Sequence, residues 1–462
     1  MKKIVLGMMA ALCVGMAQGA GFGIYEASAR GNAMGGAVVG DTSDATANYY
    51  NPANLAFATN VQIAAGLTMI NPYCDVEVDH VSQDRMNSGW FAVPSFYLTI
   101  PLPADFSLGW GNYTEFGLGS KYSRNWDLSG DTQQTTLQQV TLNPNLAYKI
   151  TDWWSVSAGI RGSWIEFKNH KQPNNGDTYY GTTSLGSVSP LLSGYSASYS
   201  IADAYHLDSR LCGNDWAMGW NAATTLKPTD KWDIGVVYRS QLRHKIKGNF
   251  TLDGKVGGTP IVQVPSQVQM LGKMVGMSIP STVAGSAQYQ SIHEYGKASA
   301  KLRLPESITV GTNYKFTDRF RGGASVTYTR WSSVSSINWR LPNGRSYKQD
   351  LNWRDTFRVG FGGEYDITDW MCGRLGYTFD EDPTSKHHES TMLPAGDRHI
   401  IGMGLGFKII DNLRLDVSYN FIRMNNEHYF ITYSGANGDV TKRMSCRNGV
   451  SHLIGATLSY EF

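Results

Sequence analysis

A run of three potential metal ligands, His387-His388-Glu389, is the first candidate for chemistry in this chain. Imidazole and carboxylate groups bind zinc, but a zinc site needs a further ligand at a recognised spacing, and the sequence offers none around this motif. It also contains no nucleophile elbow and no phosphate-binding loop. We therefore predict no catalytic residue, no metal site and no cofactor, and we interpret the motif as part of a solvated loop.

Three arginines could instead hold an anion. Arg161, Arg239 and Arg243 fall on or near the inward faces of segments that we expect to be strands. A guanidinium group in an apolar site binds a carboxylate strongly, so these residues are candidates for contacts with the head group of an acidic ligand. The alternative is that they pair with acidic residues of the protein itself, such as Asp233.

Two long segments, 169–212 and 250–297, are rich in apolar residues although they are expected to be loops. Exposed apolar patches usually mark binding sites, and methionine adapts to hydrophobic ligands of varied shape. The candidates for an external hydrophobic groove are Met270, Leu271, Met274, Met277, Leu191 and Leu192. The alternative is that these side chains only pack the two loops against each other.

The elements that must position these residues are strands with one apolar face. Between His452 and Phe462, most of the side chains at alternate positions are apolar, and most of those at the intervening positions are small or polar. A chain that ends on an apolar strand with terminal aromatic residues suits a wall with lipid outside and water inside. No window beyond the N-terminus holds the roughly 18 apolar residues of a membrane-spanning helix.

Short turns connect these strands at one end of the predicted sheet. A motif of the type Tyr148–Trp153, with Thr and Asp at its centre, recurs along the chain as far as 407–412, and Leu102–Asp105 adds a further turn. Six such turns, with both termini on the same side, give seven hairpins and hence 14 strands. Lipid offers no partner to a free backbone amide, so we predict an all-β fold, a closed 14-stranded antiparallel transmembrane β-barrel.

The N-terminal part of the chain does not follow this alternation. Residues 1–19 have the charge, the short apolar run and the small residues of a cleavable signal peptide. Residues 20–60 are rich in small residues but contain enough apolar side chains to pack, so we predict a plug inside the barrel of residues 61–462. A disordered tail is the alternative. These features together predict export to the bacterial outer membrane.

Net charge and cysteine content add little. A net charge of +2 gives no reason to expect a nucleic-acid partner. An exported chain can form disulfides, and Cys74, Cys212, Cys372 and Cys446 remain after signal cleavage. Their connectivity cannot be read from the sequence; Cys212 and Cys446 both lie near expected loop ends, and free thiols are the alternative.

Gly21-Phe22, Ala29–Gly31 and Asn48–Ala53 begin a series of motifs that continues along the barrel through Thr329–Ser332 to Leu393–Arg398, so that it covers essentially the whole mature chain. Taken in order, these motifs resemble those of the FadL-type outer-membrane transporters, the OmpP1/FadL/TodX family. The resemblance implies a 14-stranded barrel, an N-terminal plug (the hatch), and passive uptake of long-chain fatty acids or other hydrophobic molecules. Asn54 departs from the usual sequence of the hatch motif, and the loops have sequences of their own.

The resemblance also implies roles for individual residues. Phe22 would lie where the internal pocket of the family begins, and Asp380 resembles an acidic element near the plug. In the family, a kink in the third strand opens the barrel wall sideways. The residues assigned to the hatch and its gating are Asn51, Pro52 and Ala53, and the glycines of the stretch that matches the kink are Gly109, Gly111 and Gly117.

We therefore predict a passive channel for a hydrophobic small molecule such as a fatty acid, and no enzyme. The ligand would land on the loop groove, reach a pocket near Phe22, and leave when residues 20–60 shift. The expected partners are the lipid bilayer, lipopolysaccharide and the barrel-assembly machinery, which would recognise the C-terminal strand, and the protein is expected to be a monomer. The alternatives are a general polar-solute porin, a barrel enzyme (phospholipase or protease), and a surface adhesin or phage receptor.

Overall fold

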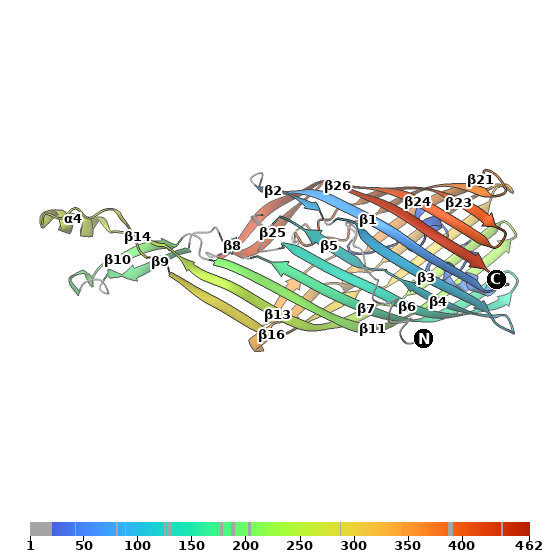
Figure 1. The fold of residues 1–462 in the computed structure, drawn as a ribbon, viewed down its shortest axis with the longest axis horizontal. Coiled ribbons are helices and arrows are strands. Elements are labelled where there is room, and N and C mark those ends of the chain that lie inside the picture. Colours follow the sequence, from blue (N-terminus) through green and yellow to red (C-terminus); the bar gives the residue numbers. More distant parts are fainter. Residues whose placement is uncertain are drawn as a thin grey trace.

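The fold is seen in a computed structural model (Figure 1), which describes residues 21–41, 43–79, 82–87, 89–123, 126, 132–172, 174–175, 179–185, 190–201, 205–286, 288–344, 346–386, 391–435 and 438–462. The predicted signal peptide, 1–19, and the motif His387-His388-Glu389 lie outside these residues. Among the described residues, no helix has the length and the hydrophobicity needed to cross a bilayer.

The chain forms a closed antiparallel barrel of 14 strands, as the sequence predicts. The last strand pairs with the first, from Gln62 opposite Glu461 onward, which removes the sheet edge. In chain order the wall strands are β1 (Gln62–Val78), β3 (Phe91–Pro101), β4 (Phe106–Tyr113) with β5 (Gly117–Lys121), β6 (Gln134–Thr151), β7 (Trp154–Lys171), β11 (Tyr205–Thr229), β12 (Trp232–Arg239) with β13 (Leu242–Gly258), β16 (Gln288–Leu304) with β17 (Ser307–Lys315), β18 (Phe320–Thr329), β21 (Thr356–Asp366), β22 (Met371–Asp380), β23 (Arg398–Ile410), β24 (Leu413–Met424) and β26 (Gly438–Glu461).

Alternation along these strands sorts side chains between lipid and lumen. On β11, Trp216, Met218 and Trp220 are all more than half exposed, whereas Ala217 between them is buried. All six predicted turns join consecutive wall strands at one end of the barrel. They connect β3 to β4, β6 to β7, β11 to β12, β17 to β18, β21 to β22 and β23 to β24.

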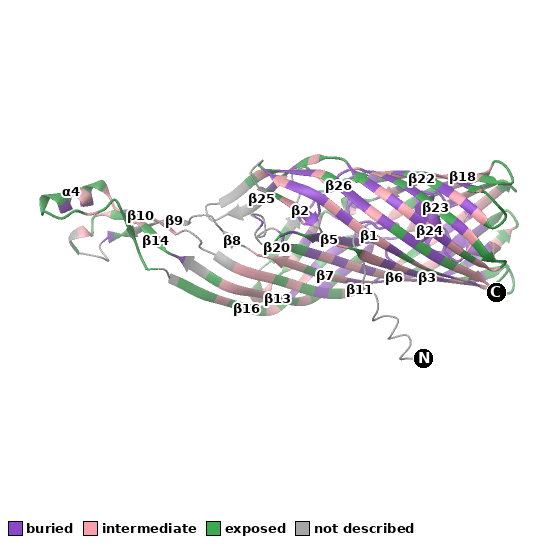
Figure 2. Cartoon of the chain, turned by 45° about the horizontal axis from the view of Figure 1, so that its top comes forward, coloured by how far each residue is buried: buried purple, intermediate pink, exposed green. Residues whose placement is uncertain are grey.

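At the other end, the middle parts of the two long segments form a separate small module. Residues 205–212, 250–258 and 288–297 of these segments, which were expected to be loops, instead belong to the wall strands β11, β13 and β16. The antiparallel sheet of the module contains β9 (Tyr179–Ser184), β10 (Ser196–Ile201), β14 (Pro260–Gln263) and β15 (Thr282–Ala284), and the helix α4 (Ser266–Met274) joins β14 to β15. Figure 1 shows this module projecting beyond the barrel on extensions of β11, β13 and β16, and Figure 2 shows that its surface is largely exposed. The remaining elements are β2 (Ser82–Asn87), β8 (Asn174–Asn175), η3 (Pro190–Leu192), η4 (Trp331–Ser333), β19 (Ser336–Arg340), η5 (Pro342–Gly344), β20 (Ser346–Asp350) and β25 (Glu427–Gly435).

The first described residues, 21–41 and 43–57, which we call the plug segment, contact the inner face of the wall. They contain α2 (Ala29–Ala33), α3 (Ala47–Tyr50) and η1 (Pro52–Phe57), and nearly all of their side chains are buried. The amide of Ala29 donates to Thr457 Oγ1 on β26 at 2.9 Å, and Asn51 Nδ2 donates to Thr225 Oγ1 on β11 at 2.8 Å. The segment therefore bonds to strands that are far apart around the barrel.

Glycines in the wall allow this segment to approach closely. A Cβ atom added to Gly360 would lie 2.1 Å from the carbonyl oxygen of Gly35, and one added to Gly376 would lie 2.5 Å from the amide nitrogen of Gly35. Any side chain at either wall position would collide with backbone, which cannot give way as a flexible side chain can. The inner surface is thus shaped to the backbone of residues 34–36.

A buried network of charges also fastens the segment to the wall. Arg30 Nη2 lies 2.8 Å from Glu364 Oε1, and Glu364 Oε2 accepts from Arg374 Nε at 2.8 Å. Arg374 in turn contacts Asp416 at 2.6 Å, and all four groups are less than a tenth exposed. Removing one member of such a buried pair costs about 3–5 kcal/mol, because the remaining charge stays buried without its partner.

Replacing Arg30 by alanine is therefore expected to loosen residues 21–57 from the wall. We expect higher ion conductance of the reconstituted barrel in planar lipid bilayers, because water and ions gain access to a lumen that the segment fills. Arg210→Ala is the matched control, since Arg210 is exposed and pairs with Asp208 far from this segment. Equal conductance for Arg30→Ala and the control would contradict this role of the network.

Candidate ligand-binding pocket

The third wall strand is interrupted on the outer side of the plug segment, and segments beside three other wall strands also turn into the lumen. The third wall strand breaks at 114–116 between β4 and β5, and η4 follows β18. The segments 351–355 and 391–397 precede β21 and β23 in the same way. These segments carry Trp331, Leu351, Trp353 and Leu393 into the lumen, where they pack with inward-facing side chains of the wall strands such as Leu137.

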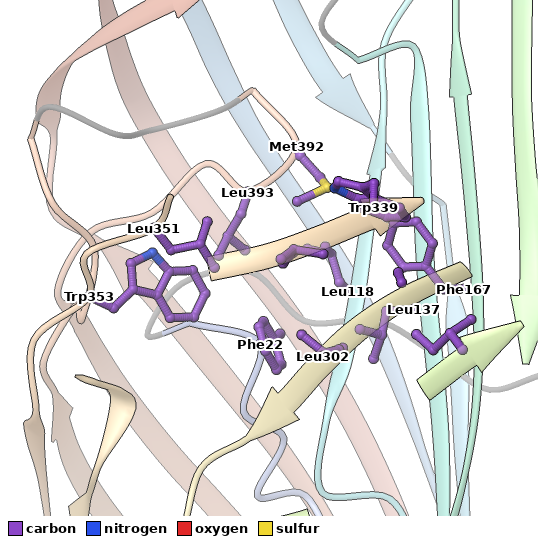
Figure 3. A pocket seen from close by; sticks show the side chains of 13 residues that line it. Phe22, Leu118, Leu137, Phe167, Leu302, Trp339, Leu351, Trp353, Met392 and Leu393 are labelled. Atoms are coloured by element: carbon purple, nitrogen blue, oxygen red, sulfur yellow. The ribbon is translucent and has the colours of Figure 1, made fainter. Parts of the chain in front are cut away.

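These side chains enclose an apolar pocket around Phe22 (Figure 3). Phe22 packs edge-on against Trp331 with ring centroids 5.0 Å apart, and the Trp353 ring lies 5.5 Å away. Trp331 is only 1% exposed. The lining residues are Phe22, Leu118, Leu137, Phe167, Ile246, Ala300, Leu302, Ile337, Trp339, Leu351, Trp353, Met392 and Leu393. No lining residue is charged.

The pocket is nearly full of its own side chains. Its free volume is about 30 Å³, whereas pockets that hold drug-sized ligands measure roughly 300–1,000 Å³. A hydrophobic ligand can therefore enter only if lining side chains move. Because Phe22 belongs to the plug segment, its displacement would move the plug as well as the pocket wall.

Backbone hydrogen bonds join Phe22 to the break in the third strand. The amide of Gly117 donates to the carbonyl of Phe22 at 2.8 Å, and the amide of Ile24 donates to the carbonyl of Glu115 at 2.8 Å. Gly21 has φ +63°, and a Cβ there would meet the Trp331 ring at 2.7 Å, so only glycine fits before Phe22 without strain. The plug thus supplies hydrogen-bond partners to a wall segment that has turned away from its neighbour.

The same break leaves part of a wall strand without its usual neighbour. Strand β3 begins at Phe91, but its ladder with β4 extends only from Pro101 to Phe96, which lies opposite Asn112. Of the three glycines assigned to the kink, only Gly117 lies at the break, where it begins β5. A Cβ on Gly109 would lie 2.2 Å from the side chain of Asn48, and one on Gly111 would lie 2.8 Å from the Tyr113 ring. These two glycines make room inside the barrel.

Arg161 and Arg239 belong to a buried ionic cluster at the break. Arg161 Nη2 lies 2.5 Å from Glu115 Oε2, and Arg239 Nε lies 3.5 Å from Glu115 Oε1. Thr141 Oγ1 also donates to Glu115 at 2.8 Å. Both arginines thus pair with an acidic residue of the protein, which is the alternative that the sequence left open, although the partner is Glu115 and not Asp233.

Arg243 does not face the lumen, so its placement from sequence was wrong. Arg239 faces inward and contacts the plug segment at Tyr49, and the next residue, Ser240, is buried. Because these two successive residues both face inward, the alternation of inward and outward side chains shifts by one residue from β12 to β13. Arg243 is consequently exposed on the outer surface, where its Nε donates to Gln241 at 2.9 Å.

The hatch motif lies against β7 and β11. Asn51 Oδ1 accepts from the amide of Ala53 at 3.1 Å and so caps η1, which begins with Pro52. Asn54, the departure from the usual motif, accepts from Thr225 Oγ1 at 2.6 Å and therefore joins the bonds that Asn51 makes to the same residue.

Asp380 lies at the end of β22 and is buried. It pairs with Arg398 on β23, and Arg358 lies 3.8 Å away. The Arg358 guanidinium also covers the Tyr25 ring at 4.3 Å, so this acidic group is two contacts from the plug segment.

The apolar loop residues divide into two groups. Val262, Val264, Leu192 and Ile279 pack against a small core formed by Leu185, Ala197 and Val268, which agrees with the packing alternative. Met270, Leu271, Met274 and Met277 are between 43% and 76% exposed on or beside α4, at the far end of the module (Figure 1). They lie outside the pocket lining, and the Leu191 side chain lies outside the described ones.

The pairing of Cys212 with Cys446 was one of two alternatives that the sequence left open, and this disulfide is not formed. Cys212 is an exposed free thiol on β11. Cys446 lies on β26 in a buried cluster that also contains Cys74.

The family model for outer membrane protein transport proteins (OMPP1/FadL/TodX) matches residues 10–462. The chain belongs to this family. A putative outer membrane protein of Neisseria meningitidis is 25% identical over 100% of this chain and 99% of its own length. The long-chain fatty acid transport protein of Escherichia coli K12 is 23% identical, with 91% of each chain covered.

Solved structures agree in fold. A Pseudomonas aeruginosa FadL homologue superposes with a TM-score of 0.76 at 20% identity, over 96% of this chain and 100% of the other. The Pseudomonas putida toluene transporter TodX superposes with a TM-score of 0.66 at 16% identity, over 96% and 99%. The protein is therefore an outer-membrane barrel of the FadL type.

Sequence reasoning placed Phe22 but missed its neighbours. Trp331 lies in a family-like motif, Thr329–Ser332, and Leu393 begins another, yet neither received a role. Both motifs lie in stretches between short turns where the two-residue alternation of apolar and polar side chains is interrupted. Such breaks were the available signal for inward turns.

The Glu115 cluster gives a test of stability. Glu115→Gln leaves Arg161 and Arg239 buried without a full counter-charge, so we expect a loss of about 3–5 kcal/mol in the free energy of unfolding, measured by urea titration in lipid vesicles. Asp411→Asn is the control, because Asp411 pairs with Lys408 on an exposed turn, and no measurable change is expected. Equal unfolding midpoints for the two variants would show that the cluster does not support the break.

Proposed function

We propose that the protein is a passive outer-membrane channel for hydrophobic small molecules such as fatty acids or aromatic hydrocarbons. The observation that carries the proposal is the wholly apolar pocket around Phe22. Burial of apolar surface supplies the affinity, at roughly 25 cal/mol per Å². The family and the fatty acid and toluene transporters among its relatives support the same class of ligand.

The pocket and the plug are coupled in this mechanism. A ligand that occupies the pocket displaces Phe22, and Phe22 is bonded through its carbonyl to Gly117 at the break in the third strand. Binding therefore favours a state in which the plug segment and the break have both moved, because the ligand has higher affinity for that state. The ligand then leaves beside β3, where the ladder with β4 stops.

The charged groups have supporting roles in this proposal. Arg161 and Arg239 stay paired with Glu115 in the closed state, and an acidic ligand would have to compete with that carboxylate. Asn51, Pro52 and Ala53 hold the plug to the wall, and Met270, Leu271, Met274 and Met277 form an outer apolar surface that first meets the ligand. Residues 1–19 act as the signal peptide, and the terminal strand is read by the barrel-assembly machinery.

The proposal is tested by mass spectrometry of the protein purified in mild detergent. An acyl chain or aromatic hydrocarbon retained at one per protein is expected. A protein that retains no ligand and conducts ions steadily in bilayers would be a polar-solute porin, which would overturn the proposal. Turnover of phospholipid or peptide by the pure protein would favour a barrel enzyme.

A matched pair of methionine substitutions locates the binding site. Met392→Gln places an amide in the pocket, and we expect the affinity for a fluorescent fatty acid to fall about tenfold, because the amide loses its water partners on binding. Met270→Gln makes the same change on α4 and is expected to leave the equilibrium affinity unchanged while slowing uptake. A larger loss of affinity for Met270→Gln than for Met392→Gln would place the high-affinity site on the outer module.

A further inference from the structure

A patch of basic side chains covers the outer surface of the β13–β16 strand pair. Arg243 lies opposite Arg303 and Lys245 lies opposite Lys301 in the register, and their neighbours Leu242, His244 and Leu302 point inward and are buried. The members of this basic patch, all exposed, are Arg243, Lys245, Lys247, Lys297, Lys301, Arg303 and Arg340. Arg340 joins it from β19, opposite Ser299.

The basic patch begins where the lipid-facing surface of the same strands ends. Toward the short turns, Val236 lies opposite Val310 and Tyr238 lies opposite Ile308; both Val310 and Ile308 are more than two-fifths exposed. The distance from Tyr238 to Arg243 along the chain is about 15 Å. Because short turns of such barrels lie on the periplasmic side, the patch lies at the outer surface of the membrane.

The cations of the basic patch lack ion-pair partners among the described residues. In the described part of the chain, none of the seven cations has a carboxylate oxygen within 4.0 Å, whereas the lysines at the short turns do. Asp215, the nearest acidic group on β11, accepts from the backbone amide of Lys245 at 2.7 Å. Like charges directly opposite each other on paired strands are destabilising. An external anion that binds between them would therefore stabilise the arrangement.

The surface between these strands is also hollowed. A depression is lined by Lys245, Lys247, Lys297 and Arg340 together with backbone and small side chains of β11 and β16, including Gly213 and Ser299. Lysine and arginine side chains around a concave surface can direct several donors at one multiply charged group.

We propose that the basic patch binds the phosphate groups of lipopolysaccharide in the outer leaflet. Lipopolysaccharide presents several phosphates close to the membrane surface, at the depth where the patch begins, and its acyl chains would lie along the exposed apolar side chains of β12 and β17. The binding requires only the orientation of the barrel in the outer membrane and does not rest on the proposed transport.

The test measures binding of deep-rough lipopolysaccharide to the full chain in detergent. A triple variant, Lys245→Gln with Lys301→Gln and Arg303→Gln, is expected to lose on the order of 100-fold in affinity, because each cation near an anionic lipid surface contributes roughly fivefold. The affinity of the unmodified protein is expected to fall as salt is raised. The charge-preserving variant, Lys245→Arg with Lys301→Arg and Arg303→Lys, is expected to bind as the unmodified protein does.

The matched control removes the same charge at the periplasmic end. Lys149→Gln with Lys315→Gln and Lys408→Gln changes three cations that pair with aspartates at short turns, and it is expected to leave binding unchanged. Far-ultraviolet circular dichroism shows that each variant retains its barrel. Equal loss in patch and control variants, undiminished binding of dephosphorylated lipopolysaccharide, or equal competition by phosphatidylglycerol vesicles or inorganic phosphate would overturn the proposal.

Discussion

Every backbone amide in a lipid-embedded wall must have a hydrogen-bond partner, and this requirement accounts for most of the architecture. Closure of β26 on β1 satisfies it around the circumference. Closure with 14 strands leaves a lumen too wide for wall side chains to fill, so residues 21–57 occupy it. Where the third strand leaves the wall at 114–116, the same rule is met by main-chain bonds to Phe22 and Ile24.

Two kinds of contact hold the plug segment to the wall, namely close packing of backbone against backbone and buried ion pairs. Wall glycines such as Gly360 and Gly376 let the plug backbone touch the sheet, and the chain of ion pairs from Arg30 through Glu364 to Asp416 holds it there. In the proposed mechanism, a ligand that enters the apolar pocket competes with the plug segment for Phe22, which belongs to both.

The regular part of the fold could be predicted because its signals are local. Two-residue alternation and Thr-Asp turns are read over a few positions, and they gave the strand number and the six turns. Arg243 was misplaced because two inward residues, Arg239 and Ser240, reverse the phase without any change in composition. Glu115 was missed as a partner because its ion pairs exist only where a strand bends inward.

The pocket, too, could be predicted from the sequence only in part. Phe22 was found through family resemblance, whereas Trp331 and Trp353 reach it through inward turns that join distant parts of the chain. The methionines of α4 were correctly read as exposed and apolar, but nothing in their spacing indicates a module carried beyond the barrel. Tertiary placement of that kind is set by long-range pairing between strands, such as β10 with β14.

The bond between the Phe22 carbonyl and the Gly117 amide joins main chain to main chain. Its donor and acceptor are therefore the same whichever side chains surround it. In the proposed mechanism, the side chains of the cavity can therefore change to suit another solute while the main-chain bond that holds the plug segment to the wall stays the same.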